Sequence, residues 1–387
     1  MEELLLEAET LTQVIDERIY VTRPNLPPLE KLYPMLAAIW ESKIVTNNGP
    51  FHKRFENELA KYLEAEYVNL FANATLALIV GLEALRISGE VITTPYSFVA
   101  TTHALQWNGI TPVFCDIDEK TLNIDPDKIE PLITPNTSAI MPVHVYGRPC
   151  DTDKIQAIAD KYGLKVIYDA AHAFGVRVKD KNLFLHGDMS VLSFHGTKLF
   201  TTFEGGAIVT KDDKLKKRID YLKNFGFADE VTVVGPGING KMNELQAAIG
   251  LLGLEIVQEE IEKRKIIART YLDSLDGIRG ITTFVLPDDV SYNYAYFPIL
   301  IDGNDSGVSR DKIYEGLKKH NIFARRYFYP LISNMPSYRI LPSACKENLP
   351  TANKVAEQIL CLPIYGELEI RSVRFICNCI KNILTRE

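Results

Sequence analysis

Short apolar runs alternate with amphipathic stretches along the first half of this chain. Runs with the length and composition of buried strands lie at residues 67–71, 91–94, 111–115, 139–145 and 165–168. Stretches with the spacing of helices lie at residues 75–85, 101–107 and 155–162. Short apolar strands separated by helices are typical of βαβ units, in which helices cover both faces of a mostly parallel sheet. The pattern therefore predicts an α/β domain.

The pattern changes after Gly240. Residues 242–272 contain no proline and predict a long helix that connects two domains, with Gly250 and Gly253 as weak points. Beyond this helix, the chain predicts a strand at 292–301 and helices at 309–320, 352–360 and 367–384. This mixed order of strands and helices favours a smaller α+β domain.

Two segments precede the alternating region. Residues 1–18 predict a short amphipathic helix, and the prolines within residues 23–28 predict an extended stretch. We therefore divide the chain into a helical N-terminal extension (residues 1–18), a large domain (19–255) and a small C-terminal domain (256–387).

Charge and composition limit the classes of partner. The 387 residues carry a net charge of −7, so the field of the whole molecule does not attract nucleic acid or an anionic membrane. The chain starts with acidic residues where a signal peptide is basic, and no stretch reaches about 18 apolar residues. The cysteines show no zinc-site spacing, so we expect reduced thiols and no metal site. We expect a cytoplasmic protein that binds neither nucleic acid nor membrane.

Asn73, Ala74 and Thr75 stand where a predicted strand passes into a predicted helix. The N–H groups of a helix's first turn lack acceptors within the helix and can bind an anion, to which the Thr75 hydroxyl can add a hydrogen bond. Ligands of open α/β sheets bind at the carboxyl ends of strands, where this turn lies. The turn is a candidate phosphate site, and the alternative is an ordinary helix cap.

Asp169 and His172 follow another predicted strand. Asp169 ends the strand and is followed by small residues, so its carboxylate can face a ligand crevice. Two other interpretations stay open: Asp169 caps the next turn, and His172 is a structural histidine.

Lys198 lies between an apolar strand and the Gly205-Gly206 turn. Burial lowers the pKa of an amine and makes it nucleophilic, and these neighbours are unusual for a solvated lysine. The alternative is a surface lysine in a loop.

The three sites occur in the order that the chemistry of pyridoxal 5′-phosphate (PLP) needs. A turn anchors the phosphate, a carboxylate keeps the pyridine nitrogen protonated, and a lysine forms a Schiff base with the cofactor and later moves a proton. An aromatic ring should cover the cofactor, and Phe98 follows another predicted strand.

These segments resemble the nucleotide-sugar aminotransferases of the DegT/DnrJ/StrS family from about Ile19 onward. SFHGTK at 193–198, followed by EGGA, looks like the lysine segment of the family. The resemblance implies a Schiff base at Lys198 and a phosphate contact from Ser193. DAAHA at 169–173 looks like the pyridinium segment, which implies that Asp169 contacts the ring nitrogen and that His172 lies near the ring.

The resemblance also covers the phosphate turn and the ring-stacking position. NATLAL at 73–78 is similar to the family's phosphate turn, with Ala74 in place of the commoner glycine and Thr75 next to it. Phe98 falls at the stacking aromatic. The resemblance implies the aspartate-aminotransferase fold (PLP fold type I), with a mostly parallel seven-stranded sheet in the large domain and a smaller α+β C-terminal domain.

Residues 237–244 resemble a family segment that reaches into the neighbouring subunit's site. The resemblance implies a homodimer with shared active sites, in which Asn239 contacts the partner's PLP phosphate. Lys241 stands where the family often has arginine. Lys241, Arg325 and Tyr327 are candidate substrate contacts, and the alternative for the Arg325-Arg326 pair is a solvated loop.

The resemblance favours transamination of a nucleotide sugar. The dehydratase branch of the family has a histidine where this chain has Lys198. Residues 20–30 and 46–50 look most like members that act at C-4 of dTDP-4-keto-6-deoxyglucose. We therefore expect transfer of an amino group from L-glutamate to a dTDP-linked keto-deoxysugar.

Three alternatives stay open. The same chemistry could act at C-3 of a 3-keto sugar. A non-catalytic nucleotide-sugar sensor could keep the fold, although the intact Lys198 and Asp169 argue against it. An NAD-linked α/β enzyme needs Gly-x-Gly-x-x-Gly at the first strand turn, where this chain has Asn73-Ala74-Thr75.

Overall fold

A seven-stranded sheet forms the centre of the protein. The computed structural model describes residues 17–385, so nearly all of the predicted helix at 1–18 lies outside the described residues. In spatial order the strands are β2 (Tyr67–Phe71), β10 (Gly206–Thr210), β9 (Met189–Ser193), β6 (Lys165–Asp169), β5 (Thr137–Met141), β3 (Glu90–Thr93) and β4 (Thr111–Phe114). Strand β10 runs antiparallel to both neighbours and the other pairs are parallel, which confirms the predicted mostly parallel sheet.

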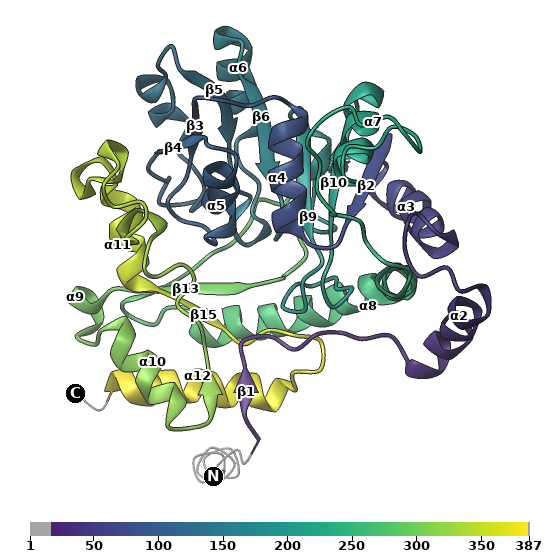
Figure 1. Ribbon diagram of the computed structural model, residues 1–387. Coiled ribbons are helices and arrows are strands. Elements are labelled where there is room, and N and C mark those ends of the chain that lie inside the picture. The colour runs from purple at the N-terminus through teal and green to yellow at the C-terminus, as the bar shows by residue number, and fades with distance from the viewer. Residues whose placement is uncertain (1–16, 386–387) are drawn as a thin grey trace.

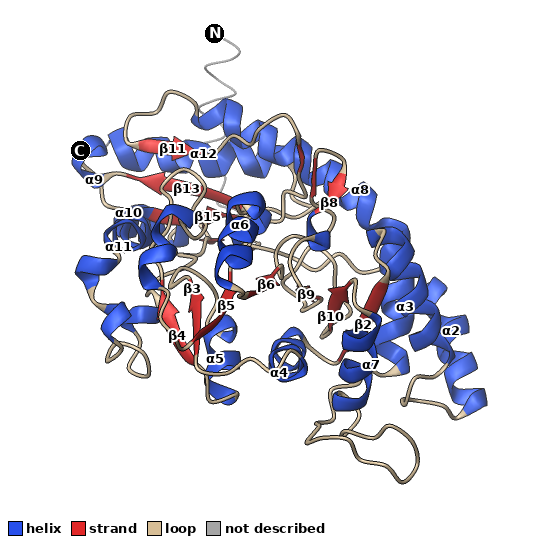
Figure 2. Ribbon diagram, turned by 90° about the horizontal axis from the view of Figure 1, so that it is seen from above, coloured by secondary structure: helices blue, strands red, loops and turns tan. Residues whose placement is uncertain are grey.

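Helices cover both faces of this sheet (Figure 2). The helices of this part are α2 (Leu29–Ser42), α3 (Pro50–Leu63), α4 (Ala74–Ala84), α5 (Ala100–Trp107), α6 (Thr152–Tyr162), α7 (Asp213–Leu222) and α8 (Glu244–Leu275). Helices α4, α5 and α7 lie on one face, and α3, α6 and α8 on the other. Neighbouring strand residues point to opposite faces, so Phe71 packs with Leu78 of α4, whereas Leu70 packs with Phe55 of α3. Because both faces are covered, most residues of these strands are apolar and buried.

The C-terminal part is an α+β unit built around a second, antiparallel sheet (Figure 1). Its strands, in spatial order, are β11 (Ile281–Thr283), β13 (Phe297–Ile301) and β15 (Ile359–Leu362). Its helices are α9 (Gly303–Ser306), α10 (Arg310–Lys318), α11 (Pro350–Gln358) and α12 (Ile370–Thr385). Shorter strands are β1 (Ile19–Tyr20) paired with β14 (Ile322–Phe323), and β12 (Val290–Ser291) with β7 (Arg177–Val178) and β8 (Lys181–Asn182).

Helix α8 joins the two parts. Its first half supplies Ala247 and Leu251 to the core beside the large sheet, and its second half supplies Tyr271 and Leu275 to the core of the C-terminal part. The predicted boundary at 255/256 falls inside this helix, and the division of the chain into domains stays a prediction.

The two glycines of α8 are points of close packing. A Cβ atom at Gly250 would lie 2.4 Å from the ring of Phe55, and one at Gly253 would lie 3.0 Å from the ring of Phe200. The sequence predicted only that these glycines weaken the helix. In the structure, each glycine also lets an aromatic ring approach the helix backbone.

Several predicted boundaries are wrong. The strand predicted at 292–301 begins only at Phe297, because the preceding residues form side-chain hydrogen bonds in place of a strand ladder. The helix predicted at 352–360 ends at Gln358, and the apolar run after it pairs with β13 as strand β15. The strand predicted at 139–145 ends at Met141, directly before a proline. Helices α2, α3 and α7 lie where no element was predicted.

Residues 17–385 contain no helix that combines the length and the apolar character needed to cross a membrane. All six cysteines are free thiols in the structure.

Candidate active site

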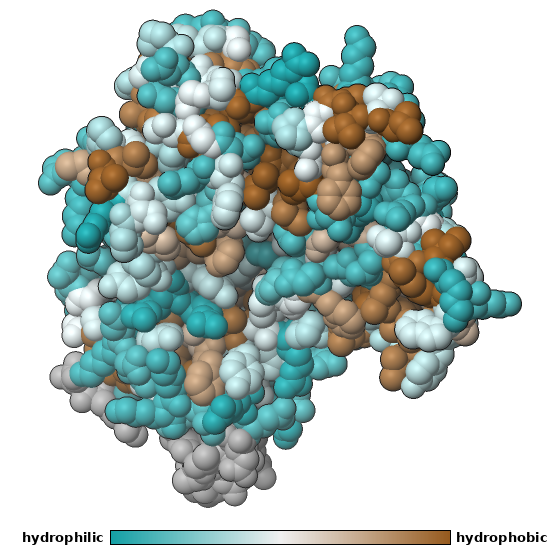
Figure 3. All heavy atoms as spheres, viewed as in Figure 1, coloured by the Kyte–Doolittle hydropathy of each residue, from teal (hydrophilic) through white to brown (hydrophobic). Residues whose placement is uncertain are grey.

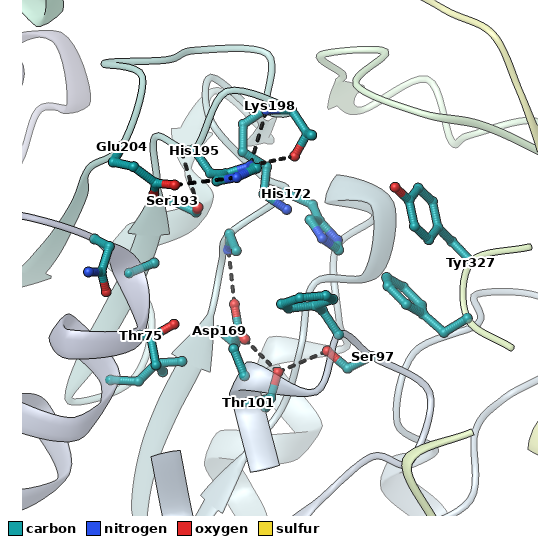
Figure 4. A pocket seen from close by; sticks show the side chains of 18 of the residues that line it. Thr75, Ser97, Thr101, Asp169, His172, Ser193, His195, Lys198, Glu204 and Tyr327 are labelled. Carbon is teal, nitrogen blue, oxygen red and sulfur yellow. Dashed lines mark hydrogen bonds and ion pairs between the residues drawn. The ribbon is translucent and has the colours of Figure 1, made fainter. Parts of the chain in front are cut away.

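A cavity of about 250 Å³ lies at the carboxyl ends of the central strands. The turns after β2, β3, β6 and β9 form one side of it, and Tyr296, Tyr327 and Phe328 from the C-terminal part of the chain complete its lining. In Figure 4, Asp169, Lys198, Ser193 and Thr75 surround the same space. The structure therefore brings together residues that the sequence placed in separate segments.

The start of α4 presents hydrogen-bond donors to this cavity. Asn73 caps the helix by accepting the Leu76 N–H at 2.9 Å, so the N–H groups of Ala74 and Thr75 lie in the first turn, where intrahelical acceptors are lacking. A Cβ atom at Gly206 would lie 2.7 Å from the Ala74 nitrogen, so only glycine lets β10 pass this close. Together with Ser193, which also lines the cavity, these donors suit a phosphate group.

Asp169 is a buried carboxylate that is held by two hydrogen bonds. Thr101 donates to Oδ2 at 2.7 Å and the Ala171 N–H donates to Oδ1 at 3.1 Å. Ser97 lies 2.9 Å from the Thr101 hydroxyl and extends the chain of hydrogen bonds. Burial raises the pKa of Asp169, although both hydrogen bonds and the charge of Lys198 act in the opposite direction. No salt bridge to Asp169 occurs among residues 17–385, so its charge is free to pair with a bound cation.

His172 is fixed as a neutral imidazole. Its Nδ1 atom accepts the backbone N–H of Tyr146 at 3.1 Å, so the ring proton is on Nε2. Burial, and after it the charge of Lys198, holds the pKa of His172 well below its usual range. The ring is parallel to that of Phe328, at 5.9 Å between centroids. His172 therefore adds no positive charge to the cavity.

Lys198 projects into the cavity from the loop between β9 and β10. A turn begins before it, because the Lys198 N–H donates to the His195 carbonyl at 2.8 Å. The Nζ atom donates to the hydroxyl of Tyr296 at 3.3 Å. The side chain is partly exposed to the cavity, but burial by the surrounding protein lowers its pKa to about 8, against the attraction of Asp169. Lys198 is therefore a more reactive amine than a solvated lysine.

Aromatic side chains line much of the remaining wall. Phe98, from the turn after β3, and Tyr327 both line the cavity. Phe98 is 58% exposed, so one of its faces is available to a ligand. Tyr296 and Phe328 are lining residues that sequence reasoning missed.

Three predicted site residues lie outside this cavity's lining. Asn239 is exposed on the loop before α8, and Lys241 donates to Asn224 Oδ1 at 2.8 Å. Arg325 pairs through its backbone with Cys361. Its neighbour Arg326 forms a salt bridge with Asp311 at 2.9 Å. Like the three predicted residues, Arg326 does not line the cavity of its own chain.

Sequence reasoning also missed residues that hold the site in place. Ser97 and Thr101 support Asp169, and Asn293 donates to the His172 carbonyl at 2.9 Å. Thr101 and Asp169 are 68 residues apart, and no local pattern links such positions. Glu204 and His195 form a further lining pair, with 3.5 Å between His195 Nε2 and Glu204 Oε1.

Comparisons with known proteins agree with this geometry. A dTDP-4-amino-4,6-dideoxy-D-glucose transaminase of Escherichia coli is 56% identical over 356 residues, which cover 91% of this chain and 95% of that protein. An enzyme of the same name from Shigella dysenteriae is 51% identical over 369 residues, covering 95% and 100%. The crystal structure of DesI in the presence of its TDP-sugar product superposes with a TM-score of 0.92 at 36% identity, covering 96% of this chain and 94% of DesI.

The family assignment rests on nearly the whole chain. Residues 30–381 match the DegT/DnrJ/EryC1/StrS aminotransferase family, and this range contains every residue of the cavity described above. With this match and two relatives above 50% identity, the chain belongs to the DegT/DnrJ/EryC1/StrS aminotransferase family.

Proposed function

We propose that this aminotransferase uses PLP to transfer the amino group of L-glutamate to C-4 of dTDP-4-keto-6-deoxyglucose, giving dTDP-4-amino-4,6-dideoxyglucose. The observation that carries the proposal is that Lys198, Asp169 and the donors at the start of α4 line one cavity. The names of the two most similar relatives reported above support the choice of C-4 over C-3. The proposal includes a cytoplasmic homodimer with shared sites.

The residues present fit PLP. The first turn of α4, with Thr75 and the hydroxyl of Ser193, would hold its phosphate. Asp169 is a buried carboxylate with a raised pKa, and a protonated pyridine nitrogen would supply the positive charge that such a group favours. Phe98 and His172 would contact the ring, and Lys198 would hold the cofactor covalently.

The protein's own part in the reaction is to move protons and to hold charge. Bound PLP supplies an electron sink, which lets the carbon that carries the amino group lose a proton. Lys198, with a pKa of about 8, has a substantial neutral fraction near neutral pH and can take that proton and return it. Asp169 stabilises positive charge at the ring nitrogen. His172 stays neutral and therefore does not oppose that charge.

The cavity of one chain is short of positive charge. Among its lining residues within 17–385, Lys198 is the one lysine and there is no arginine. The phosphate of PLP, the carboxylates of glutamate and the diphosphate of the sugar nucleotide are all anionic. This shortage supports a contribution from a second copy. We assign to it the positive charge of Lys241, together with Asn239, whose neutral amide can donate hydrogen bonds to an anion.

Exposed apolar surface also supports a dimer. Hydrophobic side chains gather over α2 and over the loop after α7 (Figure 3). The exposed apolar residues of these two segments include Leu29, Tyr33, Trp40, Phe225, Phe227, Val231, Val233 and Val234. Surfaces of this kind mark protein interfaces, and the second segment directly precedes Asn239.

The aromatic wall would contact the sugar nucleotide. Tyr327 lines the cavity and Arg325 does not, so we propose Tyr327 as the residue of this segment that binds the substrate. An aromatic face offers apolar contact to a hexose ring, and the phenol adds a hydrogen-bonding group.

The proposal is tested by product analysis. Purified protein is incubated with PLP, L-glutamate and either dTDP-4-keto-6-deoxyglucose or a dTDP-3-keto isomer, and mass spectrometry and proton NMR identify the product. We expect 2-oxoglutarate and a sugar with nitrogen at C-4, formed from the 4-keto substrate. Lys198→Ala is the control and should give neither product. An amino sugar formed only from the 3-keto isomer would contradict the proposal.

A further inference from the structure

Tyr296 contacts Lys198, although the two residues are 98 positions apart in the sequence. The Lys198 Nζ atom donates to the Tyr296 hydroxyl at 3.3 Å and lies 6.0 Å from the centre of its ring. Within residues 17–385, this is the one hydrogen bond that the structure gives to the lysine amine. The Tyr296 ring also packs against His172, at 4.8 Å between centroids. Tyr296 thus touches one proposed reacting group and packs against another residue of the cofactor site.

The backbone before Tyr296 is fixed by buried polar side chains. Asn293 is fully buried, donates to the His172 carbonyl at 2.9 Å and accepts the N–H of Ala295 at 3.0 Å. Arg264 of α8 donates to the Ala295 carbonyl at 3.4 Å. Asn293, which helps to fix this backbone, therefore also holds the loop that carries His172. A hydroxyl placed in this way is preorganised for its partner.

The phenol is suited to hold an amine without exchanging a proton with it. Burial raises the pKa of Tyr296 well above its usual range, so the hydroxyl stays neutral. Its oxygen can accept an N–H from either form of the lysine. When the amine is neutral and donates in this way, its lone pair stays free to take a proton from elsewhere.

We propose that Tyr296 is a positioning residue for the reaction, whose hydroxyl holds the Lys198 amine in place whenever that amine is not bonded to the cofactor. The inference rests on the proposed function, in which the Lys198 amine would be free of the cofactor while it carries a proton. Lys198 gains the proton and returns it, and Tyr296 neither gains nor loses one. Without this contact, the long and flexible Lys198 side chain would have to be oriented again in every catalytic cycle.

Tyr296→Phe is the informative variant because it removes the hydroxyl and keeps the ring. Tyr294→Phe is the matched control, since Tyr294 lies two residues away and packs edge-on against Tyr292 at 5.2 Å. Both variants and the wild type are prepared without cofactor. Reductive methylation of Lys198 is then followed by peptide mass spectrometry across the pH range around its pKa of about 8. The same proteins are afterwards loaded with PLP for single-turnover measurements with glutamate.

We expect two effects of Tyr296→Phe, one on the pKa of Lys198 and one on the rate of the reaction with glutamate. A hydrogen bond to an ammonium group is stronger than one to a neutral amine, so loss of the hydroxyl should lower the pKa of Lys198 by about one unit. After loading, Tyr296→Phe should slow the reaction with glutamate about tenfold, with cofactor affinity retained, because the amine is no longer held in position. Tyr294→Phe should match the wild type in both measurements.

The measurements separate two kinds of failure. If Tyr296→Phe leaves the pKa of Lys198 or the rate with glutamate at the wild-type value, the inference is overturned while the proposed function stands. If the loaded wild type does not react with glutamate, the proposed function fails and the inference fails with it. A lowered pKa in the cofactor-free variant together with a slowed reaction supports the role of Tyr296.

Discussion

The cavity has two sides that are built from different kinds of residue. On the sheet side, short polar groups and one lysine follow the ends of β2, β6 and β9. Backbone N–H groups of their own turns donate to the side chains of Asn73 and Asp169. On the opposite side, Tyr296, Tyr327 and Phe328 come from segments far along the chain and present aromatic rings. In the proposed function, charge and proton transfer therefore belong to the sheet side, whereas substrate contact and support of the amine belong to the aromatic side.

We expect the largest loss of turnover when Lys198, on the sheet side, is removed. Lys198→Ala should lower turnover at least about a thousandfold, because the group that carries the proton is lost. The melting temperature should stay close to that of the wild type, because the side chain is partly exposed to the cavity. Borohydride reduction followed by peptide mass spectrometry should find the cofactor on Lys198 in the wild type. A reducible adduct that persists in the variant would mean that another lysine carries the cofactor.

Neutralising Asp169 should have the second largest effect. Asp169→Asn keeps the shape but cannot hold a pyridine nitrogen protonated, so the single-turnover rate with glutamate should fall about a hundredfold, or about 2.7 kcal/mol on the barrier. Asp212→Asn is the matched control, because Asp212 caps α7 by accepting the N–H of Lys214 at 2.8 Å. A cap change of that kind costs about 1 kcal/mol of stability or less and should leave the rate unchanged. An Asp169→Asn rate within a few-fold of wild type would assign Asp169 the same structural role as Asp212.

The aromatic side should affect binding more than chemistry. Tyr327→Phe should raise the KM for the sugar nucleotide about fivefold through loss of one hydrogen-bonding group, and it should leave the reaction with glutamate alone unchanged. Steady-state kinetics with each substrate varied in turn would measure this. If the rate with glutamate fell instead, the two sides of the cavity would not divide binding and chemistry as described.

The proposed contribution of a second copy to the site predicts the smallest difference from wild type. Asn239→Ala, once shown to be impaired by itself, is mixed with Lys198→Ala under conditions of subunit exchange. A hybrid dimer with shared sites has one site with both lesions and one with neither, so it should recover about half of the wild-type activity. Native mass spectrometry would verify the exchange. Exchange without recovery would mean that Asn239 serves its own chain.

The sheet side could be predicted from the sequence for a physical reason. Parallel strands end at the same edge of a sheet, so polar residues that directly follow apolar runs converge there. Thr75, Asp169 and Lys198 each stand at such a position, and the structure brings them to one cavity. The alternation predicted a mostly parallel sheet, and the family resemblance implied its seven strands.

No sequence pattern of this kind identified the residues on the aromatic side of the cavity. Tyr296 lies in an apolar stretch that resembles a strand, and its role depends on the Asn293 side chain, which bonds to the His172 carbonyl. Thr101 lies within a helix, and only folding brings it to Asp169. Contacts between distant residues, unlike strand ends, leave no periodic pattern in the sequence. The places of Asn239 and Lys241 came from resemblance alone, and a single chain does not test them.

Helix α8 has a consequence for how the protein melts. It spans 32 residues, or about 48 Å, and packs Leu251 into one core and Tyr271 into the other. If either core lost its packing, the half of the helix that packs there would lose its partners. We therefore expect the two cores to unfold in one cooperative calorimetric transition, because neither can keep its share of α8 ordered after the other has melted.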